Sequence, residues 1–197
     1  MKPLLLLFPL LLMSGCAATQ SPTASSAGNV FYGDSRAVET VTNEFGSTDL
    51  QGIAETMTRS LLQSQPIARG NRPLLTIAEV KNKTSEYIDT RAVTDTIRSQ
   101  LLKSGAVRFA VDTNAMDTQT EELRRQNQTG LYKKSKSKKI GQMEGADYRL
   151  EGNIISIVKR TRDIHDVYYK FSLLLVNNES GVIEWADEKE IRKTALH

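Results

Sequence analysis

The chain has 197 residues, of which 39% are hydrophobic and 25% charged, which suffices for one domain with a real core and some appendages. Its net charge of +3 is too small to support nucleic-acid binding, and we expect none. The single cysteine excludes an intramolecular disulfide, so stability must come from core packing.

The first 16 residues differ from the rest of the chain. Lys2 supplies a short basic segment, residues 4–13 are almost purely apolar, and Ser14-Gly15-Cys16 follows at once. As a helix the apolar stretch would rise about 15 Å, roughly half of a bilayer core, so it is too short to span a membrane. The pattern predicts a secretory signal, residues 1–15, that ends in a lipobox. The alternative is an ordinary secreted protein cut at another small-residue site, with Cys16 discarded.

This start resembles the bacterial lipoprotein signal, in which the cysteine is acylated. The resemblance implies an N-acyl and S-diacylglycerol lipid on Cys16 and no other cofactor. Ala17 and Ala18 follow the cysteine, whereas an aspartate there would resemble the inner-membrane retention signal. We therefore expect a lipid anchor in the outer membrane, with the protein facing the periplasm.

The residues after the signal divide into three regions. Residues 16–29 are the lipidated cysteine and a small, polar, flexible tether. Residues 30–49 hold scattered apolar and aromatic side chains without a clean period, and we expect a partly ordered extension. Residues 50–197 carry the periodic pattern of one globular domain.

Three helices are predicted in this domain by apolar residues at spacings of three and four and by capping residues at their ends. The third is polar and peripheral. The helices cover residues 50–61, 90–103, and 112 or 113 to 126.

Five strands are predicted between and after these helices. The run 74–80 is almost continuously apolar, which is typical of a central strand buried on both faces. The order of elements predicts an α/β (α+β) fold with a mixed sheet of about four to five strands covered by helices. The remaining strands cover residues 107–111, 148–159, 167–176 and 182–191.

The residues give no support to catalysis. The sequence contains no nucleophile elbow, phosphate loop, dinucleotide fingerprint or metal-ligand spacing. His165 lies in a polar turn between two strands and His197 is the last residue, so we expect both to be surface groups. We expect a binding protein, not an enzyme.

Five lysines among residues 133–139 form the sharpest charge feature of the sequence. They must be exposed, because a buried ammonium without a partner is costly. The segment is either a solvated loop or a surface for an acidic protein or anionic polymer, whose binding would depend strongly on salt.

Several segments of the globular part follow one another in the order of a known family. The first is Leu75-Thr76-Ile77-Ala78-Glu79-Val80-Lys81-Asn82-Lys83-Thr84, and Gly145-Ala146-Asp147-Tyr148 opens another that runs to Gly152. Further matching residues are 90–103, 108–111, 136–141, 174–176 and 181–185. Through these segments about 60% of the chain resembles the LpoB-type outer-membrane lipoproteins that activate bifunctional penicillin-binding proteins.

The resemblance implies a fold like the N-terminal domain of TolB. It also implies that the domain docks on the periplasmic part of a class A penicillin-binding protein and stimulates peptidoglycan synthesis, as a monomer. The contact surfaces it favours are the loop after the first strand and the basic loop. Their named candidates are Asn82, Lys83, Thr84, Lys136 and Lys138.

The tether departs from the family pattern, in which a long Pro-rich tether is common. Residues 17–29 span at most about 45 Å at about 3.5 Å each. The main alternative is therefore an accessory lipoprotein of an outer-membrane secretion or surface-organelle complex with the same fold. A periplasmic hydrolase is a third alternative.

Overall fold

The structure is a computed structural model that describes residues 33–69 and 71–196. The predicted signal 1–15, the lipidation site Cys16 and the tether 17–29 lie outside the described residues. The chain divides into two compact units, of which the first ends at Ala37 and the second begins at Val38. No helix of the described part is long and apolar enough to cross a membrane.

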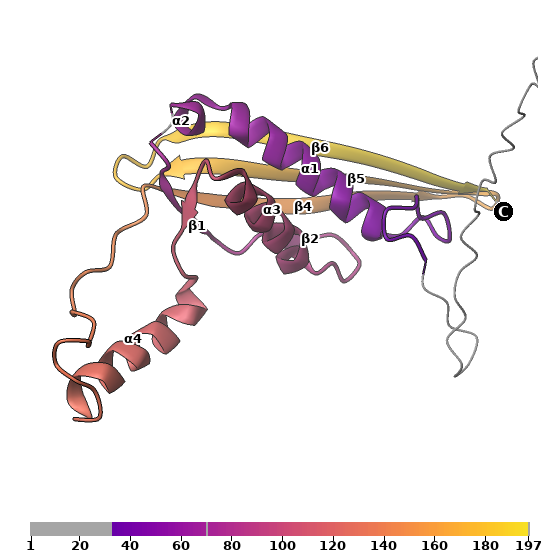
Figure 1. The fold of residues 1–197 in the computed structure, drawn as a ribbon. Coiled ribbons are helices and arrows are strands. Elements are labelled where there is room, and N and C mark those ends of the chain that lie inside the picture. Colours follow the sequence, from indigo (N-terminus) through magenta and orange to yellow (C-terminus); the bar gives the residue numbers. More distant parts are fainter. Residues whose placement is uncertain (1–32, 70, 197) are drawn as a thin grey trace, which may run out of the picture. The chain divides into compact units, whose positions relative to one another are not determined.

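The larger unit is a mixed sheet with helices (Figure 1). Its strands are β1 (Leu74–Ile77), β2 (Lys81–Lys83), β3 (Arg108–Phe109), β4 (Tyr148–Arg160), β5 (Ile164–Asn177) and β6 (Ile183–Leu196). Its helices are α1 (Ser47–Gln63), α2 (Gln65–Ala68), α3 (Thr90–Ser104) and α4 (Thr113–Gln128).

The sheet order is β3-β1-β4-β5-β6, and β2 also pairs with β4. Strands β1 and β2 run parallel to β4, whereas β4, β5 and β6 form an antiparallel meander. The predicted α+β fold with a mixed sheet is confirmed, with six strands instead of four to five. The predicted strand 74–80 ends at Ile77 as β1, and the extra strand, β2, follows it from Lys81 to Lys83, in residues that include the expected loop positions Asn82 and Lys83.

The contacts of residues 78–80 explain why β1 and β2 are separate strands. Ala78 N–H still donates to Leu150 O at 2.8 Å, so the chain follows β4 up to that point. Val80 then turns its side chain into the core and its carbonyl accepts from Thr90 Oγ1 at 2.8 Å. The expectation of a strand buried on both faces holds for Leu74 and Leu75, whereas Thr76 and Ile77 are only half-buried.

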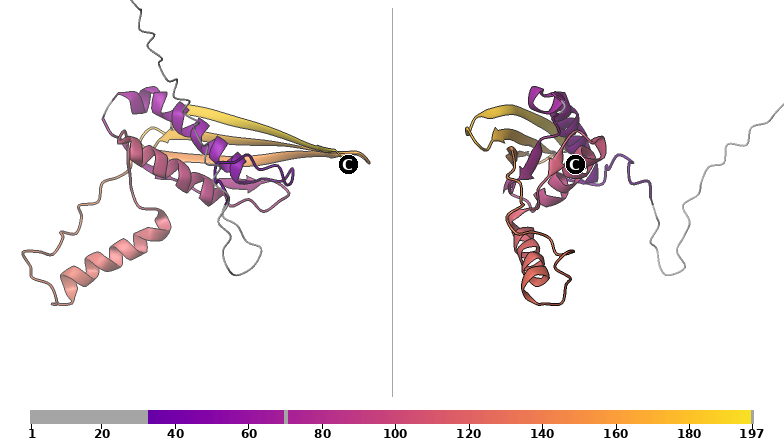
Figure 2. Two further views of the ribbon diagram at one scale, coloured as in Figure 1. Left: turned by 45° about the vertical axis from the view of Figure 1, so that its right-hand side comes forward. Right: turned by 60° about the vertical axis from the view of Figure 1, so that its left-hand side comes forward.

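Helices α1 and α3 cover one face of the sheet (Figure 2). Alternate residues of β5, from Val167 to Leu175, are buried beneath them, and the residues between are half-exposed. Each large aliphatic side chain buried in this layer contributes about 1.5–3 kcal/mol. The helix residues with full burial are Ile53, Met57, Leu61, Val93 and Leu101.

Local signals fix the ends of both helices. Asp89 caps α3 by accepting from Arg91 N and Ala92 N, and Gly105, at φ 71°, ends it as predicted. Helix α1 begins at Ser47 instead of Leu50, because Asp49 acts from inside the first turn by accepting from Gly46 N at 2.8 Å.

Several residues that carry the family resemblance serve the sheet itself. Asp147 Oδ2 accepts from Leu74 N at 2.7 Å, which fastens the start of β1 beside β4. A Cβ added to Gly152 would lie 2.1 Å from the carbonyl oxygen of Ser172, so only glycine fits between β4 and β5 there. Trp185 Nε1 donates to Ser60 Oγ at 3.2 Å and ties β6 to α1.

Candidate functional site

The predicted contact loop begins within β2, since Asn82 and Lys83 belong to that strand and only Thr84 follows it. Side chains of these residues shape the turn after the strand. Asn82 Oδ1 accepts from Thr84 N at 2.9 Å and from Thr84 Oγ1 at 2.7 Å. Asn82 Nδ2 and Thr84 Oγ1 both donate to the carbonyl oxygen of Glu86, each at 2.9 Å. Asn82 and Thr84 therefore hold the turn, and Lys83 remains exposed.

Glu86 connects this loop to two other parts of the domain. Its carboxylate accepts from Phe45 N at 3.2 Å and from the hydroxyl of Tyr169. Phe45 also packs edge-on against the Tyr169 ring, with centroids 5.8 Å apart. Burial raises the pKa of Tyr169, and the hydrogen bond to Glu86 raises it further.

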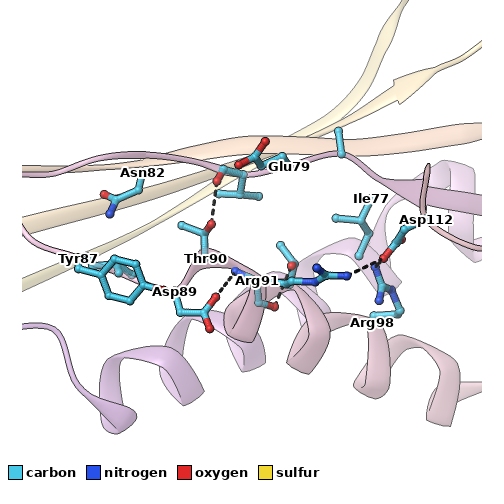
Figure 3. A pocket seen from close by; sticks show the side chains of 13 residues that line it. Ile77, Glu79, Asn82, Tyr87, Asp89, Thr90, Arg91, Arg98 and Asp112 are labelled. Atoms are coloured by element: carbon cyan, nitrogen blue, oxygen red, sulfur yellow. Dashed lines mark hydrogen bonds and ion pairs between the residues drawn. The ribbon is translucent and has the colours of Figure 1, made fainter. Parts of the chain in front are cut away.

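A cleft of about 690 Å³ opens beside the loop, between the start of α3 and the residues of β1 and β2 (Figure 3). Apolar side chains of Ile77, Val80 and Ile88 line part of it, and Glu79 and Arg91 line its polar part. Tyr87 stands at the cleft with 90% of its surface exposed. An exposed tyrosine beside a cleft is the kind of anchor that dominates many protein interfaces.

The charges in the cleft are largely paired. Asp112 accepts from Arg98 at 2.8 Å, and Arg91 lies 3.8 Å from the same carboxylate, as Figure 3 shows. The sequence predicts a helix start at Asp112 or Thr113, and Asp112 is the residue before α4. Its side chain makes no cap hydrogen bond, because Arg98 engages it instead.

The basic loop, residues 133–139, is attached to α4. Ser137 Oγ donates to Gln126 O at 3.1 Å, Lys138 N donates to Gln126 Oε1 at 3.0 Å, and Asn127 Nδ2 donates to Lys138 O at 2.9 Å. The side chains of Lys136 and Lys138 are exposed. Both predicted lysines are therefore presented on a defined turn.

The acids of α4 do not neutralise these lysines. Glu121 pairs with Arg124, and Glu122 pairs with Arg125. Hydrogen bonds from Gln126 and then from Arg125 lower the pKa of Glu122. Within the described residues, no ion pair involves a lysine of the basic loop, so its positive charge is free for a partner.

The structure does not join the two predicted contact surfaces. Asn82, Lys83 and Thr84 lie together at the end of β2, whereas Lys136 and Lys138 lie on the basic loop, and no hydrogen bond or ion pair between described residues links the two groups. The sequence interpretation also missed Tyr87. Its signal was an aromatic residue two positions before the helix cap Asp89.

Residues 33–69 and 71–196 contain no group of three or more potential metal ligands. His165 lies at the start of β5, not in the turn, and its Nε2 accepts from Arg160 Nε at 2.8 Å.

The site thus consists of exposed loops on an α+β domain, the character of a protein-binding module. A family model, "Peptidoglycan-synthase activator LpoB", matches residues 49–191, and the chain belongs to this family. A search of the curated proteins finds no match to the sequence.

Solved structures of LpoB are similar to the chain. The C-terminal domain of LpoB from Escherichia coli is 20% identical, with a TM-score of 0.46 over 73% of this chain and 98% of that one. The corresponding domain from Salmonella enterica is 16% identical, with a TM-score of 0.44 and the same coverage. Lipoprotein GNA1162 from Neisseria meningitidis is 14% identical, with a TM-score of 0.37 over 62% of this chain and 84% of that one.

Proposed function

We propose that this protein is an outer-membrane lipoprotein, lipidated on Cys16, that binds the periplasmic part of a class A penicillin-binding protein and activates its peptidoglycan synthesis. Membership of a family of peptidoglycan-synthase activators is the observation that carries the proposal. The exposed, charged loops support it, because an activator needs a docking surface more than it needs a cleft for a substrate.

Activation of this kind requires no catalytic residue in the activator. A bound protein raises the rate of a synthase when it has higher affinity for the more active state of that synthase. We therefore assign the protein a regulatory role, with no cofactor besides its lipid, no nucleic-acid partner and a monomeric state. Its contact residues are Lys83 and Tyr87 on one loop and Lys136 and Lys138 on the other, while Asn82 and Thr84 keep the first loop in shape.

The test is a rate measurement with the full-length protein in detergent. Each class A penicillin-binding protein of the organism is assayed for glycan polymerisation as the lipoprotein is added. We expect a saturable increase with one of them. The double change Lys136→Glu with Lys138→Glu should weaken the effect, while Lys103→Glu with Arg69→Glu, an equal change of charge at exposed positions, should not. Failure to stimulate any synthase would overturn the proposal.

The anchor is tested separately. Cys16→Ser should abolish incorporation of radiolabelled palmitate and should move the protein out of the outer-membrane fraction. Retention of label would show that another residue carries the lipid. A soluble protein that still stimulates the purified synthase is compatible with the activator role, since the globular part does the binding.

One observation favours a second candidate, an accessory lipoprotein of an outer-membrane assembly complex. Residues 39–46 are attached to the domain, for example through Asn43 Nδ2 to His165 O at 3.0 Å and Lys193 Nζ to Glu44 O at 2.7 Å. The chain available as a tether then ends near Val38, and residues 17–38 reach at most about 75 Å. A shorter reach suits a partner at the outer membrane.

A further inference from the structure

The face of the sheet opposite α1 and α3 carries a distinctive set of side chains. On β4, Ile154 is fully buried beneath the helices, so Ile155 and Ile157 point to the other face. Ile157 is 52% exposed, and its partner in the β4–β5 register is Tyr168. Two isoleucines and a tyrosine therefore form an apolar centre without a helix over it.

On the β5–β6 side of this centre, charged side chains pair with one another within the sheet. Lys170 pairs with Glu188 at 3.2 Å, and Arg192 lies 3.8 Å from Asp166. Arg192 also stacks over the ring of Tyr168 at 5.7 Å. The β5–β6 side of the face is thus nearly neutral.

On the other side, three lysines form no ion pair within the described residues. The acids of this face are engaged elsewhere: Glu151 pairs with Arg149 at 3.0 Å, and Asp166, which lies opposite Lys159, accepts from Thr194 and lies 3.8 Å from Arg192. Lys81 and Lys83 of β2 lie opposite Asn153 and Ile155, which places them on the same face as the apolar centre. Lys159 follows Ile157 on β4 with the same alternation. All three lysines are exposed. We call Lys81, Lys83, Lys159, Ile155 and Ile157 the basic strip.

We propose that the basic strip is the surface on which the synthase docks, through an acidic patch of the synthase that also presents apolar side chains. This inference rests on the proposed function and names the chemistry of its partner. Charge complementarity argues for it, since free lysines along one edge attract an acidic surface and steer its approach. The isoleucines supply apolar area that only a close contact removes from water.

The strip also explains the position of the predicted loop. Lys83 belongs both to the basic strip and to the predicted contact loop. A synthase bound to the strip would therefore also contact the turn that follows Lys83. Lys136 and Lys138 lie on a separate segment and would form a second contact with the synthase. The strip and the basic loop therefore make different predictions for the same binding assay.

The experiment measures the affinity of the full-length protein in detergent for the synthase it stimulates. Lys81→Glu with Lys159→Glu should weaken binding by about tenfold or more and flatten its dependence on salt. Lys83 is left unchanged because it also belongs to the loop. Lys103→Glu with Arg69→Glu is the matched control for charge and should bind like the unaltered protein.

The apolar part is tested by Ile157→Thr, which keeps a β-branched residue in the strand. We expect binding to weaken several-fold, whereas Ile183→Thr, the same change at a 56% exposed position in β6, should have no effect. Amide hydrogen exchange of residues 81–83 and 153–159 should slow in the complex.

The outcomes separate the two proposals. Normal affinity of the Lys81 and Lys159 variant, with loss of binding in the Lys136 and Lys138 variant, would overturn the strip and leave the activator role standing. Binding of the unaltered protein to no synthase would overturn both. Weakening by the strip variants with normal affinity of both controls supports the strip.

Discussion

The hydroxyl of Tyr169 and the carboxylate of Glu86 meet across 83 residues of sequence. Because burial and this contact raise the pKa of Tyr169, the folded state holds the phenolic proton more tightly than the unfolded chain does. The resulting stability is fully present below about pH 10, the unfolded value, and is lost as the pH rises through the folded value. The free energy of unfolding therefore depends on the protonation of Tyr169 at alkaline pH.

Tyr169→Phe is expected to lower the free energy of unfolding by about 1–2 kcal/mol at pH 7, since it removes a hydrogen bond to a charged group. Above pH 10 the difference between the two proteins should shrink, because the unaltered protein loses this contribution. Urea unfolding at pH 7, 9.5 and 11 measures both effects. A constant difference across this range would contradict the assigned pKa direction.

Asp49 and Lys193 form an ion pair in which both side chains are largely buried, with 5% and 18% of their surfaces exposed. Asp49→Ala should destabilise the protein by about 3 kcal/mol, because it removes the carboxylate that neutralises Lys193 and that accepts from the amide of Gly46, and Lys193 then keeps only the carbonyl oxygen of Glu44. The control is Glu55→Ala, which breaks an exposed pair with Arg59 and should cost less than about 1 kcal/mol. Equal losses in thermal unfolding would mean that the buried pair is not formed.

At the level of helices, replacing two glycines by alanine is expected to change stability in opposite directions. Gly52 lies inside α1, and an added Cβ would meet nothing within 4 Å, so Gly52→Ala should stabilise the protein by about 0.5–1 kcal/mol. Gly105 ends α3 at a positive φ that alanine adopts only with strain, so Gly105→Ala should destabilise it by about 1 kcal/mol. Chemical denaturation of the two variants shows whether the signs differ.

At the level of strands, Gly152 is required by the close approach of β4 and β5. Gly152→Ala should destabilise the protein by more than about 2 kcal/mol, because the new methyl group would overlap the Ser172 carbonyl. Gly145→Ala, where a Cβ would meet nothing within 4 Å, is the control and should change stability by less than about 0.5 kcal/mol. A tolerated Gly152→Ala would show that the two strands separate easily.

Regular periodicity made most elements predictable. Helix α3 has an N-cap, an apolar stripe and a glycine stop, and β5 alternates apolar and polar residues, so both were placed within a few residues. The division between β1 and β2 was not predictable. It depends on Val80 turning into the core and on the hydroxyl of Thr90, which lies ten residues away in sequence.

The candidate site was only partly predictable, for a related reason. A run of lysines is visible in the sequence, so the exposure of Lys136 and Lys138 could be foreseen. The basic strip could not be, because Lys81 and Lys83 lie beside Asn153 and Ile155 only through the parallel pairing of β2 with β4. Side chains that a sheet brings together leave no local pattern in the chain.

For the whole molecule, tether length separates an activator from an assembly subunit. Deletion of residues 20–29 would shorten the maximal reach by about 35 Å. An activator of an inner-membrane synthase should then fail to support peptidoglycan synthesis in cells, yet still stimulate the purified synthase in detergent. A Gly/Ser replacement of equal length is the control and should retain function. Full function of the deletion in cells would favour the assembly subunit.

The hydrogen bond between Phe45 N–H and Glu86 also gives the protein a mechanical property. A pull on the N-terminal side of the chain meets the bonds of Asn43 and Glu44 to the strands first and then Phe45, whose partner Glu86 is bonded to Asn82 and Thr84. Once the first two bonds are released, the load passes to the contact loop through Glu86. With the lipid anchor proposed above, a stretched tether would change the shape of this loop before it unfolds the sheet.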